Sequence, residues 1–285
     1  MSTTPHILMC PPDYFGIEYE INAWMKKDRQ VDHPLAVKQW TALQQVLIEA
    51  GAKISLLEAV KGLPDLVFTA NAALIYRKTA ILSRFMHKQR QGEEEHDQAW
   101  LEANGFKIHK LPETISFEGA GDALFCGDTL LAGYRMRSDI KGYQDIGTLL
   151  GCRVTPLELV NPYYYHIDTC FCPLSVDTAI YFPGAFDEYG RKALTNLVPN
   201  LIEVNEEEAR SFACNAVVVN KTVATNSGCP DLHKKLKENG FCPVGTPLGE
   251  FVKSGGSAKC LTLRLDGEEG AGWKYKSGVD ANTQA

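Results

Sequence analysis

The sequence predicts an α/β fold, a five-bladed, pseudo-symmetric α/β propeller of repeated ββαβ units. A helical pattern followed by a Gly, Asn or Pro turn and a short strand recurs five times along the chain. The recurrences are spaced by 40 to 54 residues, which is typical of radial or solenoid repeats. Pairs of short apolar strands lie between them. Units of this kind, closed on themselves, place their strands around a central axis and their helices outside.

Each unit can be followed along the chain by the place where its helix ends. We expect these ends near Gly51, Gly105, Gly151, Asn200 and Gly240, each followed by a strand such as "AKISLLEAV" or "FKIHKLPE". Glycine and asparagine suit such positions because they adopt the left-handed backbone that ends helices.

Strand pairs fill the stretches between the helices. They are predicted by the apolar, β-rich run 63–76 with "TAILSRF", and then by "GDALFCGDTLLAGY", "HIDTCFCPLSVDTAIYF" and "NAVVVNKTVATNS". The run 63–76, "LPDLVFTANAALIY", reads as a buried strand pair interrupted by Asn71. An open doubly wound sheet is the competing arrangement, but no Gly-rich phosphate-binding fingerprint follows the first strand.

The domain organisation is simple. Residues 1–266 contain no linker or low-complexity stretch and are expected to form one domain. The polar, Gly-rich segment 267–285 is expected to be a flexible tail, or a linker into a further domain of a longer parent chain.

The amino-acid composition of the chain limits the kinds of partner that it is expected to bind. The chain has 285 residues, 45% hydrophobic and 22% charged, with a net charge of −6, enough for a sizeable core. It has no Lys/Arg-rich run, so we expect neither nucleic acid nor a membrane surface as partner and favour a small molecule. No apolar stretch is as long as a membrane span or a signal peptide.

The cysteines indicate a reducing compartment. There are nine, an odd number without the spacing of a disulfide framework, so we expect a cytoplasmic protein with reduced thiols. The close pair in "TCFC" has C-x-C spacing, which would place the two thiols on opposite faces of a strand, a poor arrangement for zinc. We expect no metal site.

Three stretches carry candidate chemistry. Cys260 follows a Gly-Gly turn and precedes an apolar strand, which places its sulfur at a strand start; a small buried hydrophobic role is the alternative. His166 opens the β-rich run "HIDTCFCPL", with Asp168 two residues on and expected on the same strand face. Glu118 begins a Gly-broken turn and could hold the tautomer of His166. A core histidine and a plain acidic turn are the alternative readings.

Asn71 raises a separate question. A buried amide must pair its donors and acceptors, so Asn71 either ties down a turn or faces a polar ligand. The residues alone leave both readings open.

Taken together, "FEGAGDALF", "YYYHIDTCFCPL" and "GGSAKCLTLRL" resemble the Glu, His and Cys motifs of the guanidine-modifying enzyme superfamily. This superfamily includes the dimethylarginine dimethylaminohydrolases, arginine deiminases, amidinotransferases and arginine dihydrolases. The resemblance covers residues 5 to about 266. It implies the same five-bladed propeller that the repeats predict.

The resemblance also implies roles for single residues. Cys260 would attack the guanidinium carbon, His166 would transfer protons, and Glu118 would orient His166. The substrate-binding residues implied in the same way are Asp168 for guanidinium nitrogens, Asp65 as a substrate-contacting Asp, Arg90 and Arg137 for the α-carboxylate, and Asn22 for the amino-acid end. An extra residue, Ala120, departs from the dimethylargininase pattern and puts a role for Asp122 in doubt. Catalysis would need neither a metal nor an organic cofactor.

The residue type at the position of Asn71 differs between the members of that superfamily. Dimethylargininases carry an acidic pair where this chain has Ala70 and Asn71, and deiminases have an Asp at the second position. A carboxylate suits a guanidinium, which only donates, but repels the oxygen of a ureido group; an amide can accept and donate. The resemblance is therefore to the cyanobacterial-type arginine dihydrolases, which take L-arginine to ornithine, ammonia and carbon dioxide.

Other readings stay open at this point. One is a single hydrolysis of arginine or methylated arginine to citrulline. A second is a non-enzyme, either an arginine-binding module or a ribosome-associated factor on a related fold, and a third is a metal-dependent ureohydrolase. Homo-oligomers and a C-terminal ornithine-processing domain in a longer parent chain are both compatible with the resemblance.

Overall fold

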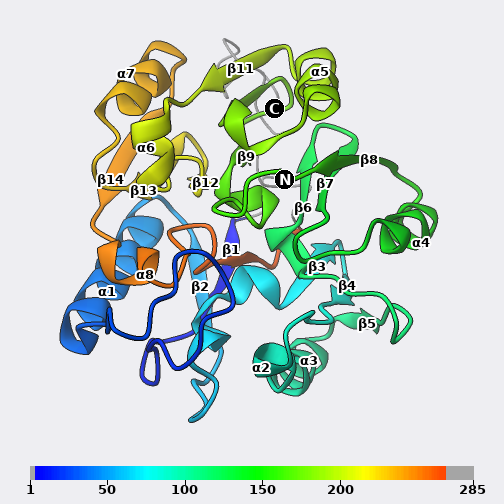
Figure 1. Cartoon of the computed structure of the whole chain (residues 1–285), viewed down its shortest axis with the longest axis vertical. Coiled ribbons are helices and arrows are strands. Elements are labelled where there is room, and N and C mark those ends of the chain that lie inside the picture. Colours follow the sequence, from blue (N-terminus) through cyan, green and yellow to red (C-terminus); the bar gives the residue numbers. More distant parts are fainter. Residues whose placement is uncertain (1–3, 268–285) are drawn as a thin grey trace.

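The computed structural model describes residues 4–267 and contains five sheets of three strands each. Figure 1 shows these sheets around a common centre, with the longer helices at the periphery. The propeller predicted from the repeats is confirmed. The predicted tail or linker over 267–285 lies outside the described residues, apart from Gly267.

Four of the sheets have the same construction along the chain. The first two strands form an antiparallel hairpin, and the third joins the second in parallel after a helical crossover. These sheets consist of β3 (Ala73–Tyr76), β4 (Thr79–Leu82) and β5 (Lys107–His109); β6 (Ala123–Cys126), β7 (Thr129–Tyr134) and β8 (Arg153–Glu158); β9 (Phe171–Pro173), β10 (Thr178–Tyr181) and β11 (Asn200–Glu203); and β12 (Val217–Val219), β13 (Thr222–Asn226) and β14 (Cys242–Thr246). This is the ββαβ unit that the sequence predicts.

The fifth sheet joins the two ends of the described chain. β1 (His6–Met9) lies between β15 (Leu263–Arg264), which is antiparallel to it, and β2 (Lys53–Leu56), which is parallel. This pairing closes the ring of sheets. It also places Cys260, just before β15, in one hydrophobic cluster with Ile7 and Met9 of β1.

The helices form the outer layer. They are α1 (His33–Glu49), α2 (Lys88–Gln91), α3 (Glu93–Ala103), α4 (Ile140–Leu150), α5 (Glu188–Leu197), α6 (Glu206–Arg210), α7 (Pro230–Glu238) and α8 (Gly249–Val252). Asp32, Asp139 and Asp187 cap the starts of α1, α4 and α5 with side-chain hydrogen bonds to backbone N–H groups.

Four of the five predicted helix ends are confirmed. Gly51, Gly105, Gly151 and Gly240 follow helices and have positive φ, the conformation that favours glycine. The prediction for Asn200 was wrong, because α5 ends at Leu197 and Asn200 already belongs to β11. Pro199 explains the early end, since the residue before a proline disfavours helical backbone.

Short 3-10 turns lead into the first strand of three units. They are η2 (Thr69–Asn71), η3 (Gly119–Gly121) and η4 (Ile167–Thr169), with η1 (Pro64–Val67) preceding η2 and η5 (Pro183–Ala185) following β10. The interpretation of 63–76 as a strand pair was therefore wrong, since its strand begins at Ala73. The turns η1 to η4 are fully buried, and apolar residues required by burial make such a sequence resemble a strand.

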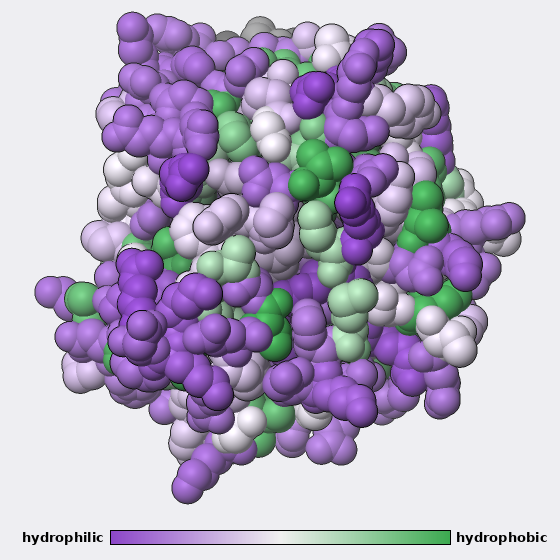
Figure 2. Space-filling view, in the orientation of Figure 1, coloured by the Kyte–Doolittle hydropathy of each residue, from purple (hydrophilic) through white to green (hydrophobic). Residues whose placement is uncertain are grey.

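One face of the propeller is crossed by residues 10–32, which contain no helix or strand. This segment is the dark blue loop in front of the sheets in Figure 1. In Figure 2, hydrophilic residues cover most of the same face, with hydrophobic residues scattered among them. Among residues 4–267, no helix is both long and apolar enough to cross a membrane.

Candidate active site

A cavity of about 260 Å³ lies beneath the segment 10–32. Six of the nine predicted site residues line it: Asn22, Asp65, Asn71, Arg90, Arg137 and Cys260. Glu118 and Asp168 contact the lining residues Arg137 and Cys260. The His166 ring packs against the lining residue Tyr165 and bonds to Glu118. A second cavity, of about 380 Å³ and lined by Leu124, Phe171 and Arg264 among others, contains none of the nine.

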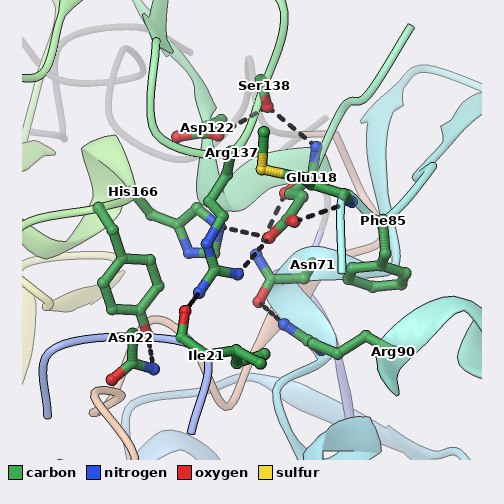
Figure 3. A network of polar contacts seen from close by, with 12 residues as sticks. Ile21, Asn22, Asn71, Phe85, Arg90, Glu118, Asp122, Arg137, Ser138 and His166 are labelled. Carbon is green, nitrogen blue, oxygen red and sulfur yellow. Dashed lines mark hydrogen bonds and ion pairs between the residues drawn. The ribbon is translucent and has the colours of Figure 1, made fainter. Parts of the chain in front are cut away.

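The propeller repeat explains why residues so distant in sequence meet here. Asn71 ends η2, Glu118 immediately precedes η3, and His166 immediately precedes η4. Cys260 lies in the turn that precedes β15. Because each unit contributes the same turn, side chains on these turns converge. Figure 3 shows Asn71, Glu118 and His166 together with both arginines.

Glu118 is the centre of a buried charge network. Its Oε2 accepts hydrogen bonds from His166 Nε2 at 2.7 Å and from Arg137 Nη1 at 3.2 Å. Burial opposes its ionisation, but the Arg137 cation and the bond from His166 outweigh that effect and hold the pKa of Glu118 well below its usual range. Glu118 is therefore a carboxylate.

His166 is neutral in this environment. Burial lowers its pKa to about 4, although the hydrogen bond and charge of Glu118 oppose the shift. Since the Glu118 carboxylate can only accept, the proton of the neutral ring is assigned to Nε2. The basic lone pair of His166 is then on Nδ1.

Cys260 differs from the other cysteines in its polar surroundings. Its Sγ lies 3.4 Å from Asp168 Oδ2 and accepts a hydrogen bond from Asn215 Nδ2 at 3.1 Å. Burial, followed by the charge of Asp168, raises the pKa of the thiol well above its usual value, while Asn215 and the backbone of Ser257 act in the opposite direction. The resting group is a neutral thiol.

The structure also explains the Gly-Gly turn before Cys260. Gly255 and Gly256 both line the cavity. A Cβ at Gly256 would collide with the ring of Phe68, and Gly255 has φ of 81°. Glycine is therefore required for the backbone to approach the cavity so closely.

Asp168 does not lie beside His166 on a strand face, so that prediction was wrong. His166 is followed at once by the 3-10 turn η4, closed by the Thr169 hydroxyl donating to the His166 carbonyl at 2.6 Å. The turn directs Asp168 to Cys260 instead.

Asn71 is fixed by hydrogen bonds at both ends of its amide. Its Oδ1 accepts from Arg90 Nη1 at 3.0 Å, and its Nδ2 donates to the Glu118 carbonyl at 3.1 Å. An amide carries two N–H donors and two acceptor lone pairs. One donor and one acceptor therefore remain for a ligand in the cavity, in a fixed orientation.

Arg90 is held by its own carboxylate partner. Glu93 accepts from Arg90 Nε at 2.9 Å and from Nη2 at 2.7 Å. Burial disfavours the cation, but Glu93 raises the pKa of Arg90 above its ordinary value, so Arg90 is a cation. Burial also raises the pKa of Glu93 to about 7, although Arg90 opposes this shift. The sequence places Glu93 in an acidic run that suggests a solvated face, so its burial is not evident from the pattern.

The segment 10–32 is attached to the cavity by three of its residues. Tyr19 donates to Asp65 Oδ2 at 3.0 Å, the Ile21 carbonyl accepts from Arg137 Nη2 at 2.8 Å, and Asn22 Nδ2 donates to the Ser254 carbonyl at 3.0 Å. Asp65 Oδ1 is buried without a hydrogen-bond partner among the described residues. Burial raises the pKa of Asp65 although Arg90 opposes this.

Sequence reasoning missed Asn215, although a signal for it exists. "ACNAVVV" around Asn215 repeats the pattern of "TANAALI" around Asn71, at the same place in its unit. Comparing the units with each other would have found it.

Within residues 4–267, no group of three or more His, Cys, Asp or Glu side chains is placed to hold a metal ion.

Comparison with known proteins supplies the family. The sequence model of a family described as N,N dimethylarginine dimethylhydrolase, eukaryotic, matches residues 11–265. The bifunctional arginine dihydrolase/ornithine cyclodeaminase ArgZ of Synechocystis is 46% identical over 93% of this chain and 38% of ArgZ. An N(G),N(G)-dimethylarginine dimethylaminohydrolase of Mycobacterium tuberculosis is 37% identical over 92% of this chain and 86% of its own length.

Solved structures agree with the sequence comparison. The N-terminal domain of ArgZ, crystallised as a cysteine-to-serine variant bound to substrate, superposes with a TM-score of 0.89 at 46% identity, covering 92% of this chain and 98% of that one. The chain spans 38% of the length of the bifunctional relatives ArgZ and AgrE. The family match over residues 11–265 and the similarity across most of the mycobacterial enzyme show that the chain belongs to the dimethylarginine dimethylaminohydrolase family.

Proposed function

We propose that this chain is an arginine dihydrolase, which hydrolyses L-arginine to ornithine, two ammonia and carbon dioxide. The observation that carries the proposal is Asn71, an uncharged amide in a cavity that also holds Cys260, oriented so that one donor and one acceptor remain free. The similarity to the N-terminal domain of ArgZ, named as an arginine dihydrolase, supports the same function.

Binding of arginine follows from the charges around the cavity. The buried Asp65 and Asp168 carboxylates would accept from the guanidinium nitrogens, and the partnerless Oδ1 of Asp65 offers one such acceptor. Arg90, Arg137 and Asn22, which line the same cavity, would hold the amino-acid group. Both arginines already bond to protein groups, so a substrate would share or replace some of these bonds.

The first hydrolysis requires a nucleophile and a proton carrier. The Cys260 thiol would lose its proton to His166 Nδ1 as its sulfur bonds to the guanidinium carbon, and His166 would pass that proton to a terminal nitrogen. The carbon–nitrogen bond then breaks and ammonia leaves, with an amidine carbon covalently attached to sulfur. Water activated by His166 adds to this carbon, and breakage of the carbon–sulfur bond leaves a ureido group.

The second hydrolysis repeats these steps on the ureido carbon. Its oxygen must now be tolerated where a nitrogen stood, and the remaining N–H of Asn71 can donate to it. Sulfur attack releases the second ammonia, water gives a carbamate on the δ-nitrogen, and loss of carbon dioxide leaves ornithine. An ornithine product agrees with the naming of ArgZ and AgrE, which join a dihydrolase to an ornithine cyclodeaminase.

A single hydrolysis to citrulline is the second candidate, favoured by the 37% identity to a dimethylarginine dimethylaminohydrolase. One experiment separates the two. The purified chain is incubated with L-arginine, and ornithine, citrulline and ammonia are quantified by mass spectrometry and a coupled assay. Ornithine with two ammonia per arginine supports the dihydrolase, citrulline as end product supports the alternative, and no product leads to methylated arginines.

A binding module without catalysis is tested in the same experiment. Cys260→Ser should abolish turnover and retain arginine binding, measured by calorimetry. In the wild type, Cys260 should be alkylated more slowly when arginine is present. Full turnover by Cys260→Ser would contradict the role of the thiol.

A further inference from the structure

The Asn215 side chain makes an unusual set of contacts with Cys260. Its Nδ2 donates to Cys260 Sγ at 3.1 Å, and its Oδ1 accepts from the Cys260 backbone N–H at 3.2 Å. Asn215 is fully buried. One side chain therefore holds both the backbone and the sulfur of the same cysteine.

The neighbouring backbone makes this contact rigid. Asn215 Nδ2 also donates to the Asp168 carbonyl at 3.0 Å, and the Asn215 carbonyl accepts from the Lys259 N–H at 3.3 Å. The amide is thus held between the unit that carries Asp168 and the turn that carries Cys260. Rotation of the amide would break all of its bonds at once.

The contact between Asn215 and Cys260 also affects the charge that the sulfur can carry. Asp168 Oδ2, 3.4 Å from the sulfur, disfavours negative charge there. The Asn215 N–H points a positive dipole end at the same sulfur and does not titrate, so it favours that charge at any pH. Hydrogen bonds to charged groups are stronger than those to neutral ones.

We propose that Asn215 is a positioning residue for Cys260, which fixes the direction of the sulfur and stabilises the negative charge that develops on it during attack. This inference rests on the proposed function, because it assumes that Cys260 is the nucleophile. Asn71 provides a contrast within the same fold. It occupies the equivalent place in its unit and donates to the Glu118 carbonyl, with no sulfur involved.

The test measures the thiol itself. Three variants are prepared. Asn215→Ala removes the amide, and Asn215→Asp removes it at near-equal volume, which retains packing if the alanine variant does not fold. Asn215→Ser is smaller but keeps a hydroxyl donor. Because burial raises the pKa of Cys260, its alkylation by iodoacetamide is followed from pH 7 to 11 without substrate, and peptide mass spectrometry separates Cys260 from the other thiols. Asn226→Ala, which removes another buried amide from the same propeller unit, is the matched control.

The alanine and aspartate variants should move the alkylation midpoint upward by about one pH unit or more, which corresponds to a tenfold loss of thiolate below the midpoint. The serine variant should lie between them and the wild type, and Asn226→Ala should match the wild type. With arginine, kcat should fall about tenfold or more with little change in KM. An unchanged midpoint in any folded variant lacking the amide would overturn the proposal.

The two proposals fail in different ways. If the wild type forms no product from arginine but the midpoint shifts as expected, the proposed function is wrong and the role of Asn215 stands. If the wild type forms ornithine and the midpoint does not move, the role of Asn215 is wrong and the function stands.

Discussion

Replacing Asn71 by aspartate should convert double hydrolysis into single hydrolysis. In the wild type, Nδ2 of Asn71 donates to the Glu118 carbonyl at 3.1 Å, and its second N–H is available to a ureido oxygen. In Asn71→Asp, the carboxylate oxygen that replaces Nδ2 has no proton to donate. Its lone pairs would face the Glu118 carbonyl oxygen and the ureido oxygen. Its bond from the Arg90 cation, now at 3.0 Å to the amide oxygen, would become an ion pair, so the variant should fold and still attract a guanidinium.

The size of the effect follows from the lost donor. A neutral hydrogen bond contributes about 1 kcal/mol, and an oxygen left buried without a donor costs about 1 to 3 kcal/mol more. Together these give about 2 to 4 kcal/mol against the ureido intermediate. Since about 1.4 kcal/mol is a factor of ten, the second hydrolysis should slow by about 30-fold to several hundred-fold relative to the first.

The assay is product stoichiometry over time. Asn71→Asp should accumulate citrulline and release close to one ammonia per arginine in the interval in which the wild type releases two. Asn71→Ala is the control, because it removes the amide without adding charge, and it should slow both steps rather than divert the product. If Asn71→Asp yields ornithine with two ammonia at the wild-type rate, the reasoning on donor and acceptor is refuted.

Three other residues, Glu118, His166 and Asp139, give further predictions. Glu118→Gln should lower kcat by about 10² to 10⁴ at saturating arginine, because His166 loses the carboxylate that favours its protonated form; retention of kcat would argue against proton transfer by His166. Between pH 6.5 and about 4, His166 takes up a proton in the unfolded but not in the folded chain, so it should reduce the free energy of unfolding by up to about 1.4 kcal/mol per unit of acidification; urea unfolding of His166→Asn should lack this contribution. Asp139→Ala should cost about 1 kcal/mol by removing the cap of α4, seen in the urea midpoint, with kcat unchanged.

Much of the fold was predictable because each unit repeats the same local signals. The hairpins and crossover helices have their own turns and caps, as at Gly151, where left-handed backbone ends α4. The closure of the ring was harder to predict from the sequence. β15 contains two residues and pairs with β1 about 256 positions away, and no local pattern specifies such a partner.

The sequence predicted which residues form the site better than it predicted how those residues are arranged. The motifs around Glu118, His166 and Cys260 identified residues that do converge. The strand assumed for Asp168 failed because alternation in sequence cannot distinguish a buried strand from a buried 3-10 turn, and the turn decides where the side chain points. The partners Glu93 and Asn215 were identified from the three-dimensional contacts. Glu93 pairs with Arg90 of its own unit, whereas Asn215 bonds to Cys260 of another unit.

The resting site combines a neutral thiol with a neutral imidazole, which makes the substrate part of the catalytic apparatus. Burial raises the pKa of Cys260 and lowers that of His166, so a thiolate and imidazolium pair is unfavourable in the empty cavity. A guanidinium cation bound beside Asp168 would offset the carboxylate that opposes the thiolate, and would do so only while it is bound. Nucleophile activation would then depend on the charge of the ligand. The ureido intermediate is uncharged, so in the second hydrolysis this assistance is absent and the fixed donors, Asn215 at the sulfur and Asn71 at the ureido oxygen, must supply the stabilisation.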